Sequence, residues 1–266
     1  MANGMTSSPL IIGHRGASAY APENTLAAFR TALDAGADGI EFDVRLTRDG
    51  VPVVIHDSTL KRTGGFNHRV AELSLTELKE IDVGSWFDES SFARERVPTL
   101  EEVFQLFETT NHLLYLEMKC DSNERDKLAK TCCDLLHSTA LKHRVIVECF
   151  DLQGIESVKN IDCEIKTAAL FEPSLRIPPT LPMGNRIIKE ALAVKADEIA
   201  LHHRLANRRV IDAARNSNLQ VVVWTVDDPG WVKKASSFGI TCLITNDPKS
   251  LVQQREIEAQ AVIRVE

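Results

Sequence analysis

Apolar positions along the chain fall into eight short runs of the kind that forms buried strands. Most of these runs are followed by a segment in which apolar residues recur at helical spacing. Such alternation predicts parallel βαβ units, and eight of them predict an α/β protein of the TIM type, a (β/α)₈ barrel. The eight runs are residues 10–13, 39–44, 113–118, 145–150, 166–171, 198–202, 221–226 and 242–245.

A further apolar run, residues 51–56, follows the second predicted strand too soon for a crossover helix. We interpret it as the returning arm of an antiparallel hairpin. Asp49-Gly50 is a strong signal for a two-residue turn, and pairing about that turn places Asp43 opposite His56. Opposed residues point to one face, with Cβ atoms about 4.5–5.5 Å apart, so His56 should return to the face of Asp43. A slip of one residue would instead turn His56 away.

A long segment separates this hairpin from the third predicted barrel strand. It contains two capping-box motifs, Ser74-x-x-Glu77 and Thr99-x-x-Glu102, which mark the starts of helices. The second motif should open the helix that precedes the third strand. Residues 57–97 are therefore predicted to be a small insertion over one end of the barrel.

Length, charge and cysteine spacing restrict the class of protein. The 266 residues suit one barrel of about 250 residues, with residues 1–8 as a disordered lead-in and residues 9–266 as a single domain. A formal net charge of -7 without a basic stripe argues against a nucleic-acid partner. No run approaches the roughly 18 apolar residues of an integral membrane segment. Six cysteines without CxxC spacing predict free thiols in a reducing cytoplasm. No oligomeric state is predicted.

Charged residues gather toward the ends of two predicted strands, where barrel enzymes build their sites. Glu41 and Asp43 alternate on the second strand, and Glu117 and Lys119 alternate on the third, so each pair points to one face. Three carboxylates in one buried space would repel one another, and a bound divalent cation removes that repulsion. Oxygen ligands favour Mg²⁺ or Ca²⁺ over zinc.

Short motifs occur in one order along most of the chain. They are His14-Arg15-Gly16, Pro22-Glu23-Asn24-Thr25, Glu41-x-Asp43-Val44, Asp49-Gly50, Val54-x-His56-Asp57, Pro98-Thr99-Leu100-Glu101-Glu102, Glu117-x-Lys119, Trp224-Thr225-Val226 and Ile244-Thr245. In this order, from about residue 11 to residue 248, the sequence resembles the glycerophosphodiester phosphodiesterase family.

The resemblance implies metal-dependent hydrolysis of a small-molecule glycerophosphodiester to sn-glycerol 3-phosphate and an alcohol. It implies that His14 and His56 are the general acid and base. Histidine suits both tasks, because its reference pKa of about 6.5 lies near working pH. Glu41, Asp43 and Glu117 would hold one divalent cation, Mg²⁺ or Ca²⁺.

Other residues would then bind the substrate. Arg15 and Lys119 are expected to contact phosphate oxygens, and Trp224 is expected to form an apolar wall for the glycerol. Two positions depart from what is common in the family, because Cys149 stands where serine is frequent and Asn246 where aspartate is frequent. Neither is an expected ligand.

Two rival functions stay open at this stage. One is a lysophospholipase D-like or cyclising phosphodiesterase that acts on a lipid with the same histidines and carboxylates. The other is a non-catalytic barrel that binds a phosphorylated ligand. The sequence also leaves open whether water or a neighbouring substrate hydroxyl attacks the phosphorus first.

Overall fold

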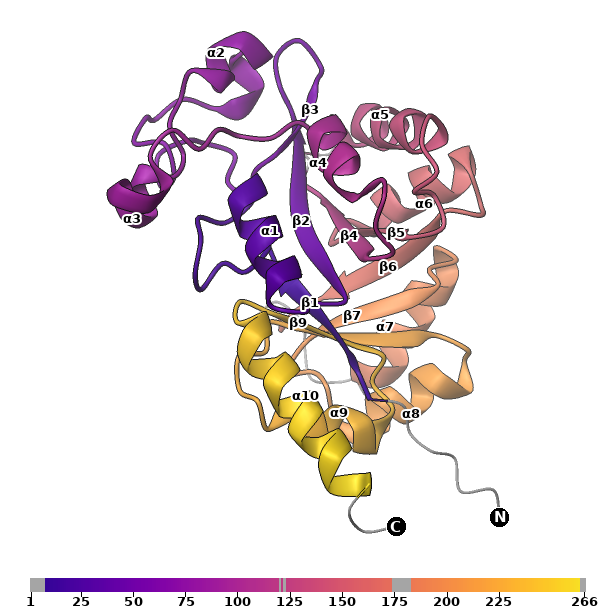
Figure 1. Cartoon of the computed structure of the whole chain (residues 1–266). Coiled ribbons are helices and arrows are strands. Elements are labelled where there is room, and N and C mark those ends of the chain that lie inside the picture. Colours follow the sequence, from indigo (N-terminus) through magenta and orange to yellow (C-terminus); the bar gives the residue numbers. More distant parts are fainter. Residues whose placement is uncertain (1–7, 120, 122, 174–182, 264–266) are drawn as a thin grey trace.

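The computed structural model describes residues 8–119, 121, 123–173 and 183–263 (Figure 1). Of the predicted lead-in, residues 1–7 lie outside the described residues. Eight parallel strands pair in the order β1-β9-β8-β7-β6-β5-β4-β2, and a pairing of β1 with β2 closes the barrel. The predicted (β/α)₈ barrel is therefore confirmed. Its strands are β1 Leu10–His14, β2 Gly39–Leu46, β4 Leu113–Met118, β5 Val145–Cys149, β6 Lys166–Phe171, β7 Glu198–His202, β8 Gln220–Trp224 and β9 Cys242–Thr245.

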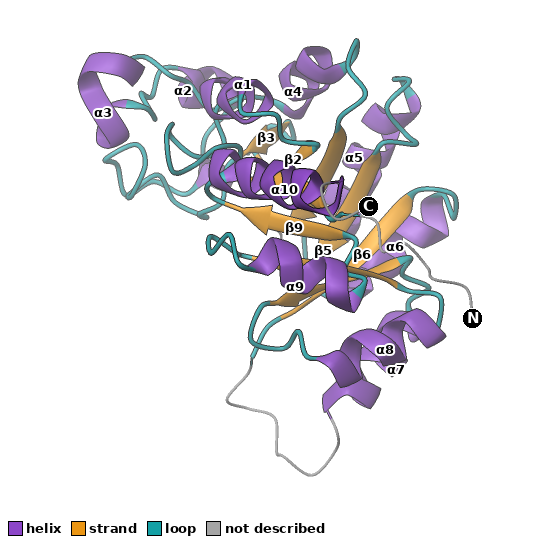
Figure 2. Cartoon of the chain, turned by 60° about the horizontal axis from the view of Figure 1, so that its bottom comes forward, coloured by secondary structure: helices purple, strands orange, loops and turns teal. Residues whose placement is uncertain are grey.

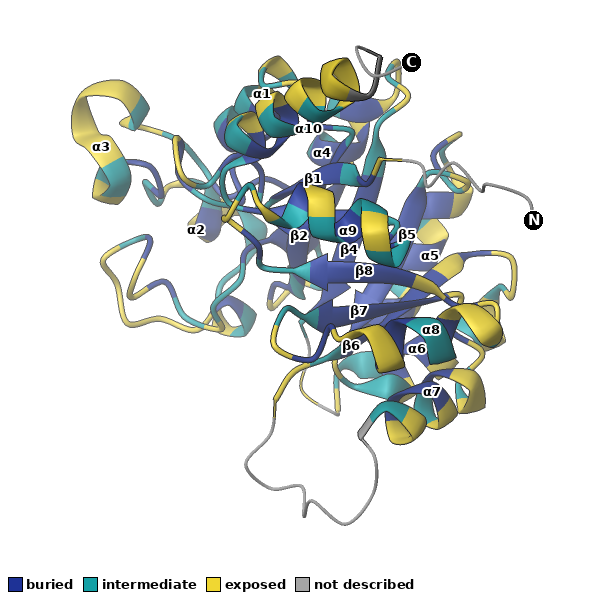
Figure 3. Cartoon of the chain, turned by 90° about the horizontal axis from the view of Figure 1, so that it is seen from below, coloured by how far each residue is buried: buried dark blue, intermediate teal, exposed yellow. Residues whose placement is uncertain are grey.

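Helices surround the barrel and cover the outer face of its strands (Figure 2). The strands are almost wholly buried, whereas the helices expose their outward faces (Figure 3). Within the described residues, no helix combines the length and the apolar character that crossing a bilayer requires. The surrounding helices are α1 Leu26–Asp34, α4 Leu100–Phe107, α5 Arg125–His137, α6 Leu152–Ile161, α7 Met183–Ala193, α8 Arg208–Asn216, α9 Trp231–Phe238 and α10 Pro248–Ile263.

Short polar side chains start several of these helices. Thr25 caps α1, where its hydroxyl accepts a hydrogen bond from Ala28 N at 3.1 Å. At α4, Thr99 and Glu102 each accept from the other's backbone N–H, which completes the predicted capping box. Ser74 and Glu77 form the other predicted box, at the start of α2 Leu75–Lys79.

The segment between β2 and α4 forms a small layer beside the barrel mouth. It contains β3 Pro52–Val54, the 3₁₀ helix η1 Val70–Glu72, α2 Leu75–Lys79 and α3 Ser85–Phe92. In Figure 1, α2 and α3 lie to one side, beyond α1. This layer has its own apolar cluster, which consists of Val53, Ile55, Leu60, Val70, Leu78, Val83 and Val97.

The predicted hairpin forms, but its predicted register is wrong by one residue. Val44 pairs with Val54, and Ile55 N donates to Asp43 O at 2.9 Å, so Ile55 rather than His56 lies opposite Asp43. A two-residue type I′ turn needs two residues with positive φ. Here only Gly50 has one, at 82°, and three residues connect Thr47 to Val51. His56 instead follows the end of β3, where the chain bends away from the ladder.

Gly16 allows the loop after β1 to approach α1 closely. Its φ is 83°, and a Cβ there would lie 2.6 Å from the carbonyl carbon of Ala28. We expect Gly16→Ala to lower the free energy of unfolding by roughly 1–2 kcal/mol through the left-handed backbone and roughly 1–3 kcal/mol more through the clash. Urea unfolding measures both contributions together.

Gly65→Ala is the matched control for this prediction. Gly65 has a similar φ of 73°, but a Cβ there would meet nothing within 4 Å. The control should therefore lose only the backbone contribution. Equal losses in the two variants would show that the contact with α1 does not matter.

Candidate active site

A pocket opens at the carboxyl ends of the barrel strands, and seven of the eight predicted site residues line it. The eighth of them, Asp43, is buried and forms ion pairs with two of the others, Arg15 and Lys119. The structure thus brings the whole predicted set together in one place. The seven that line the pocket are His14, Arg15, Glu41, His56, Glu117, Lys119 and Trp224.

Strand register explains how the acidic residues meet. In the parallel ladder, Glu41 of β2 pairs with His14 of β1, and Asp43 pairs with Glu117 of β4. Glu117 in turn pairs with Glu148 of β5. Residues two apart share a face, and Tyr115, two before Glu117, packs in the apolar cluster inside the barrel. The acidic side chains therefore point into the barrel at its open end.

His14 is held through Nδ1. Asn246 Oδ1 lies 2.7 Å from this nitrogen, while Asn246 Nδ2 donates to Asp227 Oδ2 at 2.8 Å. The Asp227 carboxylate can only accept a hydrogen bond, so the NH₂ of Asn246 faces it. The Asn246 oxygen therefore faces His14 and accepts a hydrogen bond from Nδ1–H. Burial, followed by the positive charge of Arg15, lowers the pKa of His14 to about 4. His14 is therefore neutral, and its unprotonated Nε2 lies 3.8 Å from Glu41 Oε2.

His56 is also held through Nδ1, but by a carboxylate. Asp57 Oδ1 lies 2.7 Å from His56 Nδ1, and Arg62 Nε donates to Asp57 Oδ2 at 2.8 Å. Burial lowers the pKa of His56, and the negative charge of Asp43 opposes that shift. The carboxylate accepts the Nδ1 proton, so Nε2 is the nitrogen free to exchange protons in the pocket.

A chain of ion pairs connects the two histidine loops. Glu23 accepts from Arg15 Nη1 at 2.8 Å and from Arg62 Nη1 at 2.6 Å. Arg62 binds Asp57, the partner of His56. Because Arg15 directly follows His14, and Asp57 directly follows His56, these ion pairs connect the loop of one histidine to the loop of the other.

The two basic pocket residues neutralise part of the acidic cluster. Lys119 Nζ lies 2.6 Å from Glu117 Oε1 and 3.3 Å from Asp43 Oδ1. Arg15 Nε lies 3.2 Å from Asp43 Oδ2, and the Arg15 backbone N donates to Glu41 Oε2 at 3.0 Å. Burial alone would raise the pKa of Asp43, but Lys119 and Arg15 hold it well below its ordinary value.

At the other buried carboxyl groups of the pocket, burial outweighs the nearby positive charge, and this includes Glu117, which pairs with Lys119. Burial, and next the charge of Asp43, raise the pKa of Glu117 to about 7 and that of Glu41 well above its ordinary value. Burial and the charge of Glu41 also raise the pKa of Glu148. Glu41 Oε1 and Glu148 Oε2 are buried without a hydrogen-bond partner. Crowded, unsatisfied carboxylate oxygens are the donors that a hard divalent cation prefers, so these residues fit such an ion.

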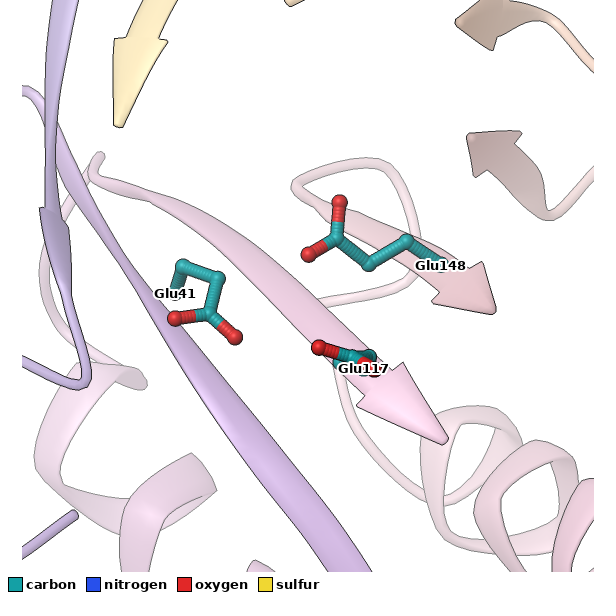
Figure 4. A group of neighbouring side chains, drawn as sticks. All are labelled: Glu41, Glu117 and Glu148. Carbon is teal, nitrogen blue, oxygen red and sulfur yellow. The ribbon is translucent and has the colours of Figure 1, made fainter. Parts of the chain in front are cut away.

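Sequence reasoning missed Glu148. Figure 4 shows its carboxyl group directed toward those of Glu41 and Glu117. One potential ligand atom from each of these three residues lies within 4.8 Å of the other two. Asp43 is not in this group. A glutamate inside an otherwise apolar strand was the available signal, but only the register of β4 and β5 places it beside Glu117.

Aromatic side chains form another wall of the pocket. Trp224 Nε1 donates to Ala200 O at 3.1 Å, and the Trp224 ring meets that of Phe150 edge-to-face with centroids 5.5 Å apart. Cys149, the last residue of β5, is buried, and its thiol donates to Met118 O at 3.3 Å. Asn246, the other unusual position, contacts His14 directly.

Sequence comparison identifies the family. The profile of the glycerophosphoryl diester phosphodiesterase family matches residues 14–250. The chain is 33% identical to a glycerophosphodiester phosphodiesterase of Caldanaerobacter subterraneus subsp. tengcongensis over 91% of this chain and 96% of that protein. It is 31% identical to one of Bacillus subtilis, over 90% of this chain and 84% of that protein.

Solved structures agree with this result. An Oleispira antarctica phosphodiesterase in complex with its product sn-glycerol-3-phosphate superposes with a TM-score of 0.83 at 24% identity, over 94% of this chain and 97% of that one. A glycerophosphodiester phosphodiesterase of Agrobacterium tumefaciens has a TM-score of 0.77 at 25% identity, over 92% and 99%. The chain belongs to the glycerophosphoryl diester phosphodiesterase family and is an enzyme of the phosphoric diester hydrolase class.

Proposed function

We propose that the enzyme hydrolyses soluble glycerophosphodiesters to sn-glycerol 3-phosphate and an alcohol, with His14 and His56 as its proton-transfer groups and one divalent cation bound. The observation that carries the proposal is the convergence of two imidazoles and a buried carboxylate cluster on one pocket. The Oleispira antarctica relative, which holds sn-glycerol-3-phosphate, supports the identity of the product.

The hydrogen bonds of the two histidines support different roles. The amide oxygen of Asn246 accepts the Nδ1 proton of His14 and leaves Nε2 able to take a proton, so His14 is the general base. Asp57 stabilises the positive charge that His56 carries when Nε2 also holds a proton. His56 is therefore the general acid that protonates the leaving oxygen.

Charge on the phosphoryl group is balanced by the residues around it. Arg15 and Lys119 bind its oxygens, the guanidinium through two donors and the ammonium as a point charge. Glu41, Asp43 and Glu117 hold the cation, Mg²⁺ or Ca²⁺, which when bound polarises a phosphoryl oxygen. Trp224 provides the apolar wall against the glycerol carbons. The cytoplasmic location expected from the cysteines stays a prediction.

Substrate choice is tested by supplying glycerophosphocholine and lysophosphatidylcholine side by side. We expect phosphorus NMR to show sn-glycerol 3-phosphate from the first and little turnover of the second, because the proposed substrate is the soluble diester. Turnover of the lipid alone would favour a lysophospholipase D-like enzyme. A cyclic phosphate as the final product would favour a cyclising phosphodiesterase.

A further inference from the structure

The acidic cluster contains one carboxyl group more than the proposed cation ligands account for. Glu148 is 1% exposed and lines the pocket, yet its Oε2 has no hydrogen-bond partner. Burying a polar oxygen without a partner is costly unless a ligand satisfies it. Figure 4 shows the Glu148 carboxyl group directed toward those of Glu41 and Glu117, and one potential ligand atom from each of the three lies within 4.8 Å of the other two.

Asp43 and Glu148 have different surroundings. Asp43 receives a hydrogen bond from Asn24 Nδ2 at 2.7 Å and forms ion pairs with Arg15 and Lys119. Among the described residues, Glu148 forms no ion pair with a lysine or an arginine. A cation placed among the unsatisfied oxygens would therefore meet Glu148 as readily as Asp43.

The pocket also contains more acidic than basic side chains. Four buried carboxyl groups, those of Glu41, Asp43, Glu117 and Glu148, face two basic side chains, Arg15 and Lys119. Arg15 is also shared with Glu23. When all four are ionised, at least two negative charges lack a basic partner, and one divalent cation supplies that charge.

We propose that Glu148 is a fourth carboxylate ligand of the cation, bound together with Glu41 and Glu117. This inference rests on the cation site of the proposed function and extends it. Ca²⁺ takes six to eight oxygen ligands in flexible geometry, whereas Mg²⁺ keeps several waters and is usually held by one or two carboxylates. A fourth carboxylate therefore makes the site favour Ca²⁺ over Mg²⁺.

The test is calorimetric titration of the chelator-treated full-length protein with Ca²⁺ and, separately, with Mg²⁺. In Glu148→Gln, the affinity for Ca²⁺ should fall at least about tenfold, which is the loss that even an outer-shell change typically causes. The affinity for Mg²⁺ should fall less. Glu172→Gln is the matched control, because Glu172 is an exposed carboxylate that lines the same pocket outside the cluster, and its variant should bind Ca²⁺ as the wild type does.

Thermal unfolding without cation checks that the variant is folded. Glu148→Gln should unfold at no lower temperature than the wild type, because the Glu148 carboxyl group has no hydrogen-bond partner at Oε2 that the amide would lose. Glu148→Asp gives a second measurement, since it keeps the charge but withdraws the carboxylate by one methylene. It should also bind Ca²⁺ more weakly.

Glu41→Gln separates failure of this inference from failure of the proposed cation site. Loss of Ca²⁺ binding in Glu41→Gln but not in the Glu148 variants would overturn the role of Glu148 alone. Unchanged binding in all of them would overturn the cation site as well. Equal losses of Ca²⁺ and Mg²⁺ affinity in Glu148→Gln would retain Glu148 as a ligand and overturn the preference for Ca²⁺.

Discussion

Replacing His14 with alanine should lower kcat for glycerophosphocholine by roughly 10²- to 10⁴-fold, the usual contribution of a general acid or base. The loss should fall on kcat rather than on KM, because proton transfer matters in the transition state and not in the bound ground state. Steady-state kinetics with phosphorus detection measures both constants.

The structure limits what else this substitution can disturb. His14 makes one side-chain hydrogen bond, to Asn246, and that residue remains held by Asp227 and Ser18. Cation affinity and the unfolding temperature should therefore stay near the wild-type values. A variant that binds the cation and unfolds normally but does not turn over would place the defect in the chemical step.

His143→Ala is the matched control. His143 is exposed in the loop before β5, at the amino end of the strand and so at the opposite end of the barrel from the pocket. Its removal should leave kcat unchanged. If His14→Ala retained activity within a few-fold of the wild type, the proposed acid-base pair would be wrong and the role of base would have to pass to another group.

The barrel was predictable because its signal is local and repeated. Each strand is an apolar run of the expected length, and the runs at residues 113–118, 166–171, 198–202 and 242–245 agree with the observed strands at both ends. Capping boxes at Ser74 and Thr99 also act within four residues of sequence. Local rules of this kind do not depend on tertiary contacts.

The site could be predicted only where the spacing of charged residues along a strand indicates a shared face. Glu41 with Asp43 and Glu117 with Lys119 show the alternation of a strand face, so the sequence alone groups each pair. Glu148 has no charged neighbour two residues away, and its place beside Glu117 depends on the register between β4 and β5. That register is a property of the closed barrel rather than of either strand.

His56 lies at the pocket, as predicted, although the hairpin register from which this was predicted is wrong. Asp49-Gly50 predicted a two-residue turn, but the loop has three residues, and Asp49 instead accepts hydrogen bonds from Thr47 Oγ1 and Leu75 N. His56 reaches the pocket because the chain bends after β3 and Asp57 binds the imidazole. Contacts with the inserted layer, which a hairpin rule does not include, decide this geometry.

Removing divalent cations with a chelator should stop turnover, with a loss of at least roughly a hundredfold, because a cation that polarises a phosphoryl oxygen supplies several kcal/mol. The physical reason lies in the carboxyl groups. Burial and mutual repulsion raise the pKa of Glu41, Glu117 and Glu148 in the absence of the ion, so these carboxyl groups need a cation if all of them are to be ionised together. The barrel should stay folded, because its apolar core does not depend on the ion.

Adding Mg²⁺ or Ca²⁺ to the chelated protein should restore the rate, and elemental analysis should establish that the chelated sample was free of metal. Full activity in such a sample would contradict a catalytic cation and leave Lys119 and Arg15 to balance the phosphoryl charge alone. Lys119 and Arg15 already form ion pairs with Asp43, so they could balance the phosphoryl charge only by giving up those ion pairs. A buried aspartate without its ion-pair partners is costly, so the structure favours a bound cation over a rearrangement of Lys119 and Arg15.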